Sequence, residues 1–429
     1  MMSRALVTIS GALLVWSCAL DEGGKQGSKP TGGGGGSSIE AGTAAESGAG
    51  AVEDGSSGDR FVAPVDGESA DVSGSDATTL SGCNAATAHA RADASLERMI
   101  TGFWNETSQY FDATEPANGR LTGYWTFAQA FDAVLDGVER TTGRKYFTYI
   151  ETLYAAQNAR GWSSPYYDDE SWMVLALLRA FDMTAERAYL DRALTLYQDI
   201  AAAWDSTSVA PGGIWWNRTH TQKATASNAG PVIAGARLTA RTGDAAHLAF
   251  ARKVYDFWFT KMVDPLTYRV ADHLLPDGTV VRGLLTYNEG LMSGAALALY
   301  LATREARFLT DAHGIAQALV KNETKPTSVG PVLADGTNTS CFGDCPQWKG
   351  IAYRYLATLF RQDLQRAEYR TVLEASVEAA WTLARDPATG FFANDWRGPP
   401  TAAAGIEAQS SSAMALNLFA SLCGPYQGD

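Results

Sequence analysis

The sequence predicts an all-α fold, an (α/α)6 barrel in which six helical hairpins close into a ring. Twelve amphipathic stretches with helical periodicity follow one another between residues 84 and 421. Short and long connections alternate between them, which indicates helical hairpins. Patterns typical of strands are nearly absent. An open solenoid is the alternative, but the absence of a repeated sequence motif favours a closed barrel.

The predicted helices are stretches of about 15–20 residues that end at loops containing Gly, Pro, Asn or Asp. In order, they span 84–110, 122–140, 144–158, 168–183, 186–204, 223–241, 244–262, 286–303, 306–322, 346–363, 367–385 and 406–421. The long connections are 205–222, 263–285, 323–345 and 386–405. In a ring of hairpins they leave from one face, so we expect them to build a cleft there.

A signal peptide is predicted over residues 1–17. Arg4 precedes a short apolar core, which is too short to cross a bilayer as a mature helix. The sequence Val15-Trp16-Ser17-Cys18 resembles a bacterial lipobox, so we expect a lipid on Cys18; secretion without an anchor is the alternative. Residues 18–82 are rich in Gly, Ser, Ala and acidic residues, a composition that predicts a flexible tether.

The remaining residues, 83–429, are the predicted catalytic domain. The net charge of the chain is −13, but residues 21–82 alone carry 11 acidic and 3 basic residues, so the domain is only mildly acidic. Without a block of basic charge, a nucleic-acid partner is not expected. No apolar run has the length of a membrane span, so a lipid anchor is the expected link to a membrane.

The domain contains four cysteines, and an even number in an exported chain indicates disulfides. Cys341 and Cys345 are near enough in sequence to close a small loop, and a cyclic fold would bring Cys83 and Cys423 together. A metal site is the alternative, but no histidine lies at ligand spacing. We expect no metal or cofactor, and motifs of zinc hydrolases, esterases, phosphate loops and dinucleotide sites are absent.

The segment 161–173 carries the strongest signal for chemistry. Asp168 and Asp169 stand where a helix is predicted to begin, among Trp162, Tyr166, Tyr167 and Trp172. Capping of the helix is the alternative explanation for these acids. Aromatic rings, however, stack on the apolar faces of sugars, and retaining glycosidases use two carboxyls about 5–5.5 Å apart. The pair is therefore predicted to be a nucleophile and a general acid/base.

Other predicted helix starts carry the same mixture of polar and aromatic residues. Core packing is the alternative role for the aromatic ones. The candidate sugar contacts are Trp125, Gln129, Tyr167, Trp216, Asn228, Asp272, Tyr287, Asn288 and Lys349.

Together these segments resemble glycoside hydrolase family 76, the α-1,6-mannanases with an (α/α)6 barrel. The similarity lies in Tyr167–Trp172, Gly212–Trp216, Tyr287–Gly290, Lys349–Ile351 and Glu407–Ser411. One departure is Lys223–Asn228, where the family more often has Lys-Asn before the later Asn.

The resemblance implies retaining hydrolysis of α-1,6-mannosidic linkages, with Asp168 as nucleophile and Asp169 as general acid/base. It implies an α-mannan poly- or oligosaccharide as partner, and we expect a monomer at the bacterial cell surface or in the periplasm. Two alternatives stay open: an unsaturated glucuronyl hydrolase, which needs basic residues for a uronate, and a non-catalytic glycan-binding lipoprotein.

Overall fold

The computed structural model describes residues 79–337, 340–401 and 403–427, all within the compact unit Asp59–Asp429. These residues form twelve α-helices, and a short π-helical turn, Ala380–Ala384, extends the eleventh. The helices are α1 (Ala85–Phe103), α2 (Tyr124–Arg140), α3 (Tyr149–Arg160), α4 (Tyr167–Thr184), α5 (Arg187–Ala202), α6 (Thr225–Thr242), α7 (Ala245–Met262), α8 (Thr286–Thr303), α9 (Ala306–Asn322), α10 (Cys345–Gln362), α11 (Ala367–Ala379) and α12 (Ile406–Cys423).

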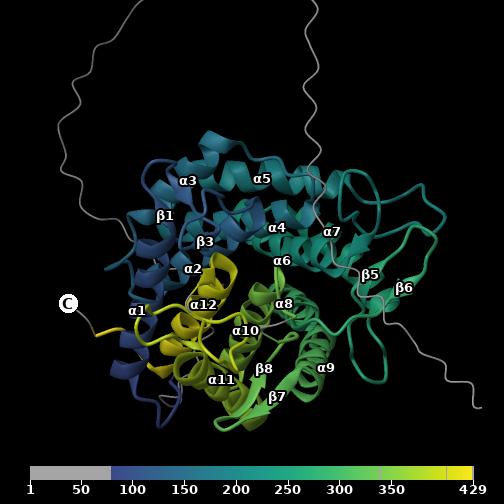
Figure 1. The fold of residues 1–429 in the computed structure, drawn as a ribbon. Helices are drawn as coiled ribbons and strands as arrows, with labels where there is room; N and C mark the ends of the chain where they lie inside the picture. Colours follow the sequence, from purple (N-terminus) through teal and green to yellow (C-terminus); the bar gives the residue numbers. More distant parts are fainter. Residues whose placement is uncertain (1–78, 338–339, 402, 428–429) are drawn as a thin grey trace, which may run out of the picture. The chain divides into compact units, whose positions relative to one another are not determined.

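The even-numbered helices form a closed inner ring (Figure 1). Each packs on the next, from α2 through α4, α6, α8 and α10 to α12, and α12 packs on α2. The odd-numbered helices lie outside the ring, and α1 packs on α12, so the two ends of the domain together build the sixth hairpin. The predicted (α/α)6 barrel is therefore confirmed.

Close contact between inner helices depends on glycine. A Cβ atom on Gly290 of α8 would lie 2.5 Å from the Cα of Ala352 on α10, and one on Gly350 of α10 would lie 2.8 Å from the Cα of Ser411 on α12. Real Cβ atoms do not approach backbone so closely. Glycine at these positions lets α8, α10 and α12 pack closely near their starts.

Short β-strands occur in several of the connections between helices, although the sequence predicts almost no strands. They are β1 (Trp104–Asn105), β2 (Tyr110–Phe111), β3 (Thr114–Glu115), β4 (Lys223–Ala224), β5 (His273–Leu274), β6 (Val280–Val281), β7 (Thr324–Thr327), β8 (Gly330–Leu333) and β9 (Ala404–Gly405). All pairings are antiparallel: β1 with β2, β3 with β9, β5 with both β4 and β6, and β7 with β8. Most have two residues, too few for a periodic signal in the sequence.

Two helix boundaries differ from the prediction. The first helix ends at Phe103 rather than at 110, because the following residues form the β1–β2 hairpin. The third begins at Tyr149 rather than at 144, since residues 141–148 form turns in which Thr142 and Tyr146 have positive φ. A left-handed backbone cannot continue a helix.

The two ends of the domain are joined covalently. Cys83, just before α1, forms a disulfide with Cys423, the last residue of α12, and a second disulfide joins Cys341 to Cys345. The backbone N–H of Leu80 donates to the carbonyl of Leu422, and Leu80 is buried. Residues 79–82, assigned to the tether from composition, thus pack with the barrel.

A buried ionic network fills part of the ring. Arg354 of α10 donates two hydrogen bonds to Asp136 of α2, at 2.7 and 2.6 Å, and Arg179 of α4 lies 2.9 Å from the same carboxylate. Removing one partner would leave a buried charge uncompensated, so these three inner helices depend on one another.

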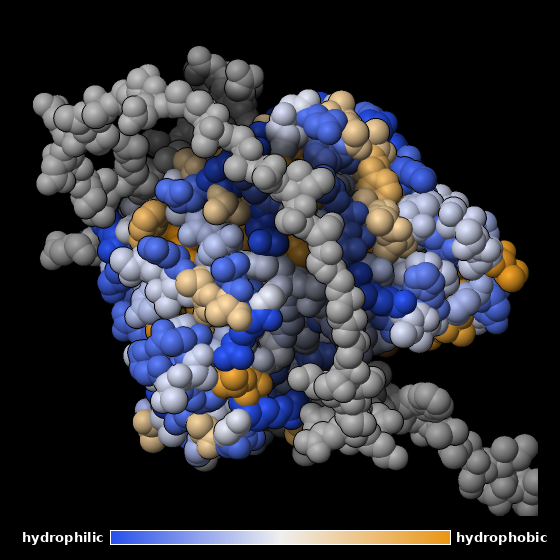
Figure 2. Space-filling model, turned by 90° about the horizontal axis from the view of Figure 1, so that it is seen from above, coloured by the Kyte–Doolittle hydropathy of each residue, from blue (hydrophilic) through white to orange (hydrophobic). Residues whose placement is uncertain are grey.

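The described residues contain no helix that is both long and apolar enough to cross a membrane. On the face seen in Figure 2, hydrophobic residues form small separate patches among hydrophilic ones. The predicted signal peptide, the expected lipid site at Cys18 and the tether up to residue 78 lie outside the described residues.

Candidate active site

The acid pair lies at the start of α4. Because the backbone N–H of Tyr167 donates to the carbonyl of Trp216, the α4 entry is tied to the loop before α6. The Trp216 indole N–H donates to Asp168 Oδ2 at 3.0 Å, and the Ser164 hydroxyl donates to Asp169 Oδ2 at 2.8 Å. Each acid therefore has one oxygen fixed by a donor from a different loop.

Burial makes both acids hold protons more tightly than free aspartates do. It raises the pKa of Asp168 to about 7, against the Trp216 hydrogen bond, which lowers it. Burial and then the neighbouring Asp168 charge raise the pKa of Asp169 well above its usual range. Two carboxylates so close cannot both ionise easily, so once Asp168 ionises, at or above about pH 7, the pair carries one charge and one proton.

One oxygen of Asp168 stands out. Its Oδ1 is buried and receives no hydrogen bond from the residues described, whereas Oδ2 is bound by Trp216. An ionised oxygen without a donor is costly, and it is also more basic and more nucleophilic than a solvated one. This atom is suited to contact an electrophilic centre of a ligand.

Aromatic side chains lie at the starts of several inner helices and in the loop before α6. Trp125 of α2, Trp216, Tyr287 of α8 and Trp348 of α10 are all partly exposed. The rings of Tyr287 and Trp348 are 5.5 Å apart, and those of Tyr166 and Trp216 are 4.7 Å apart. The rings thus form two pairs, and the indole of Trp216 also contacts Asp168.

Asp272 forms a second polar centre in the loop between α7 and α8. It accepts hydrogen bonds from His273 Nδ1 at 2.7 Å, Asn288 Nδ2 at 3.0 Å and the Tyr287 hydroxyl at 3.2 Å. Burial would raise the pKa of Asp272, but these hydrogen bonds hold it below its usual value. Asp272 is therefore ionised where the α4 pair keeps a proton.

The profile of Glycosyl hydrolase family 76 matches residues 87–425. The chain belongs to this family. The family's profile covers the barrel from the first turn of α1 to the residues after α12.

Solved structures are similar to the family 76 barrel of this chain. One is an α-1,6-mannanase of Salegentibacter sp. HEL1_6, which is 25% identical to this chain with a TM-score of 0.70. That structure is of an inactive variant, in which two consecutive aspartates are replaced by asparagine, in complex with α-1,6-mannotriose. The match covers 78% of this chain and 99% of that chain. A family 76 mannosidase of Bacteroides thetaiotaomicron shares the fold at 20% identity and a TM-score of 0.68, over 78% of this chain and 98% of that chain.

A curated relative is similar over a shorter stretch. The mannan endo-1,6-alpha-mannosidase DCW1 of Candida glabrata is 32% identical over 146 residues. The match covers 30% of this chain and 32% of that relative's own length.

Several expected sugar contacts of this family 76 chain instead support the scaffold. Asn228 is fully buried: its Oδ1 accepts from the backbone N–H of Ile214 at 2.7 Å, and its Nδ2 donates to the Ile214 and Ala224 carbonyls. Lys349 is also buried and donates to the carbonyls of Pro346 and Asn394. We correct the prediction for these two side chains, because their polar atoms hold loops together.

The other predicted sugar contacts fall into two groups, buried side chains and partly exposed ones. Gln129 is buried inside the ring on α2, and the Tyr167 ring is buried with the Arg218 guanidinium 4.9 Å from its centre. The buried Asn288 reaches Asp272 with Nδ2, while its Oδ1 has no donor among the described residues. Trp125, Trp216, Asp272 and Tyr287 remain partly exposed, so these four could still reach a ligand.

Two further acids, Asp344 and Glu407, interact electrostatically; neither was a predicted site residue, although Glu407 lies in a segment that resembles family 76. Asp344, directly before α10, is exposed and accepts a hydrogen bond from the Trp125 indole at 3.0 Å. Glu407, in the first turn of α12, has a pKa raised to about 7 by burial and by Asp344. Asp344 precedes Pro346, a helix-start signal that could have identified it, but nothing local shows that it reaches α2.

Among the described residues, no group of three or more His, Cys, Asp or Glu side chains is arranged to hold a metal ion.

Proposed function

We propose that this family 76 enzyme hydrolyses α-1,6-mannosidic linkages in α-mannan with retention of anomeric configuration. The observation that carries the proposal is the Asp168–Asp169 pair, whose carboxyls are held by Trp216 and Ser164 and both have a raised pKa. It is the sole Asp-Asp dipeptide of the sequence. The similar Salegentibacter mannanase, inactive with two consecutive aspartates replaced, bound α-1,6-mannotriose, which supports both the acid pair and the substrate.

The proposed reaction divides the work between the two acids. Asp168 Oδ1 attacks the anomeric carbon while the Asp169 carboxyl gives its proton to the departing glycosidic oxygen, forming a mannosyl ester. Asp169, now ionised, takes a proton from water, the water oxygen attacks the same carbon, and the bond to Asp168 breaks. Two inversions give net retention, and the Asp168 carboxylate is recovered.

The surrounding donors suit these steps. The indole of Trp216 binds Asp168 Oδ2, so it stabilises the carboxylate before attack and as the ester breaks. The Ser164 hydroxyl orients Asp169 through its Oδ2. Asp272, bound by Tyr287 and Asn288, is the proposed acceptor for mannose hydroxyls, and Trp125, Trp216 and Tyr287 are the proposed stacking surfaces.

An unsaturated glucuronyl hydrolase activity is disfavoured by the basic residues. A uronate carboxylate needs a free cationic partner, and the candidates are Arg218, Lys223, Lys349 and Arg354. The first two lie 2.6 Å from carboxylates of Glu170 and Asp205, respectively. Lys349 donates to two carbonyls and Arg354 to Asp136, so all four cations have partners within the chain.

We further propose that the enzyme acts outside the cytoplasm as a monomer, held to a membrane by a lipid on Cys18. The apolar start of the chain and the sequence Val15–Cys18 support export and lipidation. The polymeric substrate fits this location, because α-mannan would reach the cleft only outside the cell that makes the enzyme.

Azide rescue tests the roles of the two acids. With an α-mannoside that has a good leaving group, Asp168→Ala should give the inverted β-mannosyl azide, because azide enters from the vacated nucleophile side. Asp169→Ala should still form the ester, and azide should release the retained α-mannosyl azide. Without azide, both variants should lose several orders of magnitude in activity. Asp191→Ala, on the exposed face of α5, is the matched control.

The products separate the possible results. If Asp168→Ala gave the α-mannosyl azide and Asp169→Ala the β-mannosyl azide, Asp169 would be the nucleophile and Asp168 the general acid/base. Substantial activity of both alanine variants on α-1,6-mannan would place the chemistry elsewhere and refute the mechanism. A wild-type enzyme that neither cleaves nor binds α-1,6-mannan would refute the proposed substrate and leave a non-catalytic glycan-binding role, or another sugar, to be tested.

A further inference from the structure

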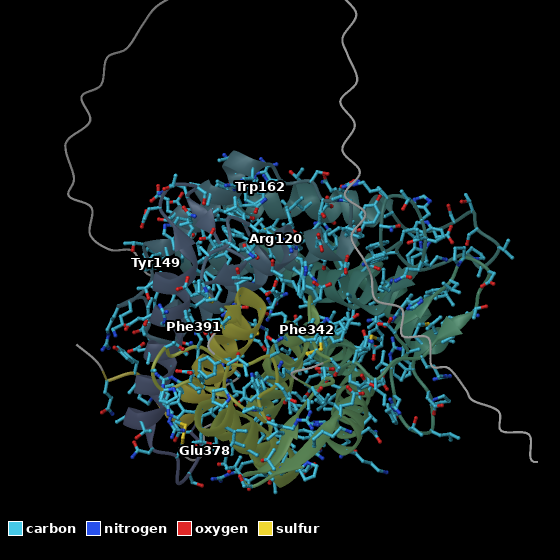
Figure 3. All side chains as sticks on the ribbon, viewed as in Figure 1. Arg120, Tyr149, Trp162, Phe342, Glu378 and Phe391 are labelled. Carbon is cyan, nitrogen blue, oxygen red and sulfur yellow. A yellow bond between two sulfur atoms is a disulfide. The ribbon has the colours of Figure 1, made fainter. Side chains whose placement is uncertain are left out.

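A small disulfide-closed loop leads into α10. Cys341 and Cys345 close a ring of five residues directly at the start of α10. Figure 3 shows its Phe342 beside disulfide sulfur atoms. Its Asp344 accepts a hydrogen bond from Trp125 of α2. The loop therefore contacts an inner helix that is separated from α10 by α12 around the ring.

The loop is held in one conformation by several contacts. Besides the disulfide, Asn394 Nδ2 donates to the Cys341 carbonyl at 2.9 Å, and the Cys345 N–H donates to the Phe342 carbonyl at 3.3 Å. A side chain on such a loop loses little conformational freedom when it binds a ligand. The two side chains that it presents, Phe342 and Asp344, are therefore preorganised.

Asp344 is not used to cap its own helix. It stands at the N-cap position of α10 but makes no side-chain hydrogen bond to the first turn. Its Oδ1 accepts from Trp125, and no described residue donates to Oδ2. The carboxylate lies near enough to the catalytic pair for its charge to raise the pKa of both Asp168 and Asp169. One acceptor oxygen beside the reacting centre is thus open to a ligand.

Phe342 is exposed where a structural phenylalanine would be covered. Its exposed fraction is 63%, and no aromatic ring among the described residues packs against it. An exposed ring on a rigid loop, two residues from a carboxylate with a free acceptor, combines the two features that bind a pyranose: a stacking surface and a hydroxyl acceptor.

We propose that the loop Cys341–Cys345 is a sugar subsite beside the acid pair, in which Asp344 accepts hydrogen bonds from mannosyl hydroxyls and Phe342 stacks on a neighbouring mannosyl unit. The proposal rests on the proposed function, since it takes α-1,6-linked mannose as the ligand.

The first test removes the ring. Phe342→Ala should raise KM for α-1,6-mannotetraose by roughly 2- to 10-fold, the range expected for one lost aromatic contact. The increase should be larger for the tetrasaccharide than for an aryl α-mannoside, which reaches fewer subsites. Leu266→Ala, at a still more exposed apolar side chain in the loop after α7, is the control.

The second test removes the charge. Asn at position 344 can still accept from Trp125, so Asp344→Asn should fold normally and raise KM for the tetrasaccharide. Without the negative charge, Asp168 and Asp169 bind protons less tightly, so both limbs of the pH profile of kcat/KM should move to lower pH. A purely structural role would not move the limbs. Glu186→Gln, an exposed acid before α5, controls for net charge.

The third test measures binding of the oligosaccharide to an inactive variant of the enzyme. In an Asp169→Asn background, calorimetry should show weaker binding of mannotetraose after Phe342→Ala and after Asp344→Asn, with unchanged thermal unfolding. If neither change alters KM, the pH limbs or this binding, the loop is no subsite. If the unmodified enzyme cleaves mannan, only this inference then fails; if it neither binds nor cleaves mannan, the proposed function fails as well.

Discussion

A pair of buried glutamates predicts how the stability of the barrel depends on pH. Glu289, in the first turn of α8, accepts from the backbone N–H of Val270 through Oε1. Its Oε2 and both oxygens of Glu323, which follows α9, are buried without a donor from the described residues. A single proton shared between the two carboxyls would supply the missing hydrogen bond.

Burial raises the pKa of Glu289 from 4.5 to about 7, and burial together with the Glu289 charge raises that of Glu323 to about 10. The folded state therefore binds these protons more tightly than the unfolded chain. This contribution to stability is complete below the unfolded pKa of 4.5 and is lost as pH rises through about 7 and toward 10. For Glu289 alone, the shift corresponds to about 3 kcal/mol.

Glu289→Gln should remove much of this loss. A glutamine Oε1 can still accept from Val270, while its Nε2 donates permanently to Glu323, replacing the shared proton. We expect the variant to be more stable than the wild type at pH 8, by up to about 3 kcal/mol or a melting temperature roughly 5 °C higher. At pH 5 the difference should be small.

Thermal unfolding followed by circular dichroism at pH 5 and pH 8 measures both quantities, with Glu186→Gln as the exposed control. The reasoning is refuted if wild-type stability is equal at the two pH values, or if Glu289→Gln is destabilised at pH 8 as much as at pH 5.

Three further changes have expected outcomes. Trp216→Phe removes the donor to Asp168, so kcat/KM should fall roughly 10- to 100-fold; the pKa of Asp168 should rise, moving the acid limb of the pH profile to higher pH, and an unmoved limb would contradict this. Replacing both Cys83 and Cys423 by Ala should lower the free energy of unfolding by up to about 5 kcal/mol, because the disulfide closes a loop with a sequence separation of 340; equal urea midpoints would contradict it. Cys18→Ala should move the protein from membrane to soluble fractions, and a wild-type protein that is already soluble would exclude the anchor.

Local signals explain how much of the cleft was predictable. Asp168 and Asp169 were identifiable because they begin a helix amid aromatic residues, and a helix start is a local property of the chain. Trp125 and Tyr287 were proposed as sugar contacts because they too lie at helix starts, and Trp216 because it lies in a long loop before one. The direction in which a side chain points from that start is not local, so Asn228 and Lys349, with equally suitable chemistry, were assigned to the sugar although their polar atoms bind backbone groups.

By itself, the sequence determined the ring of hairpins, since hydrophobic periodicity and alternating loop lengths depend only on residues near one another along the chain. It also placed Asp168 and Asp169 at a helix start, and Cys83 and Cys423 at the two ends of the domain. Only the tertiary structure decided that Asp344 reaches Trp125 and that Glu289 faces Glu323. The physical reason is that burial and partners across helices, rather than residue type, set the charge, hydrogen bonding and exposure of a side chain.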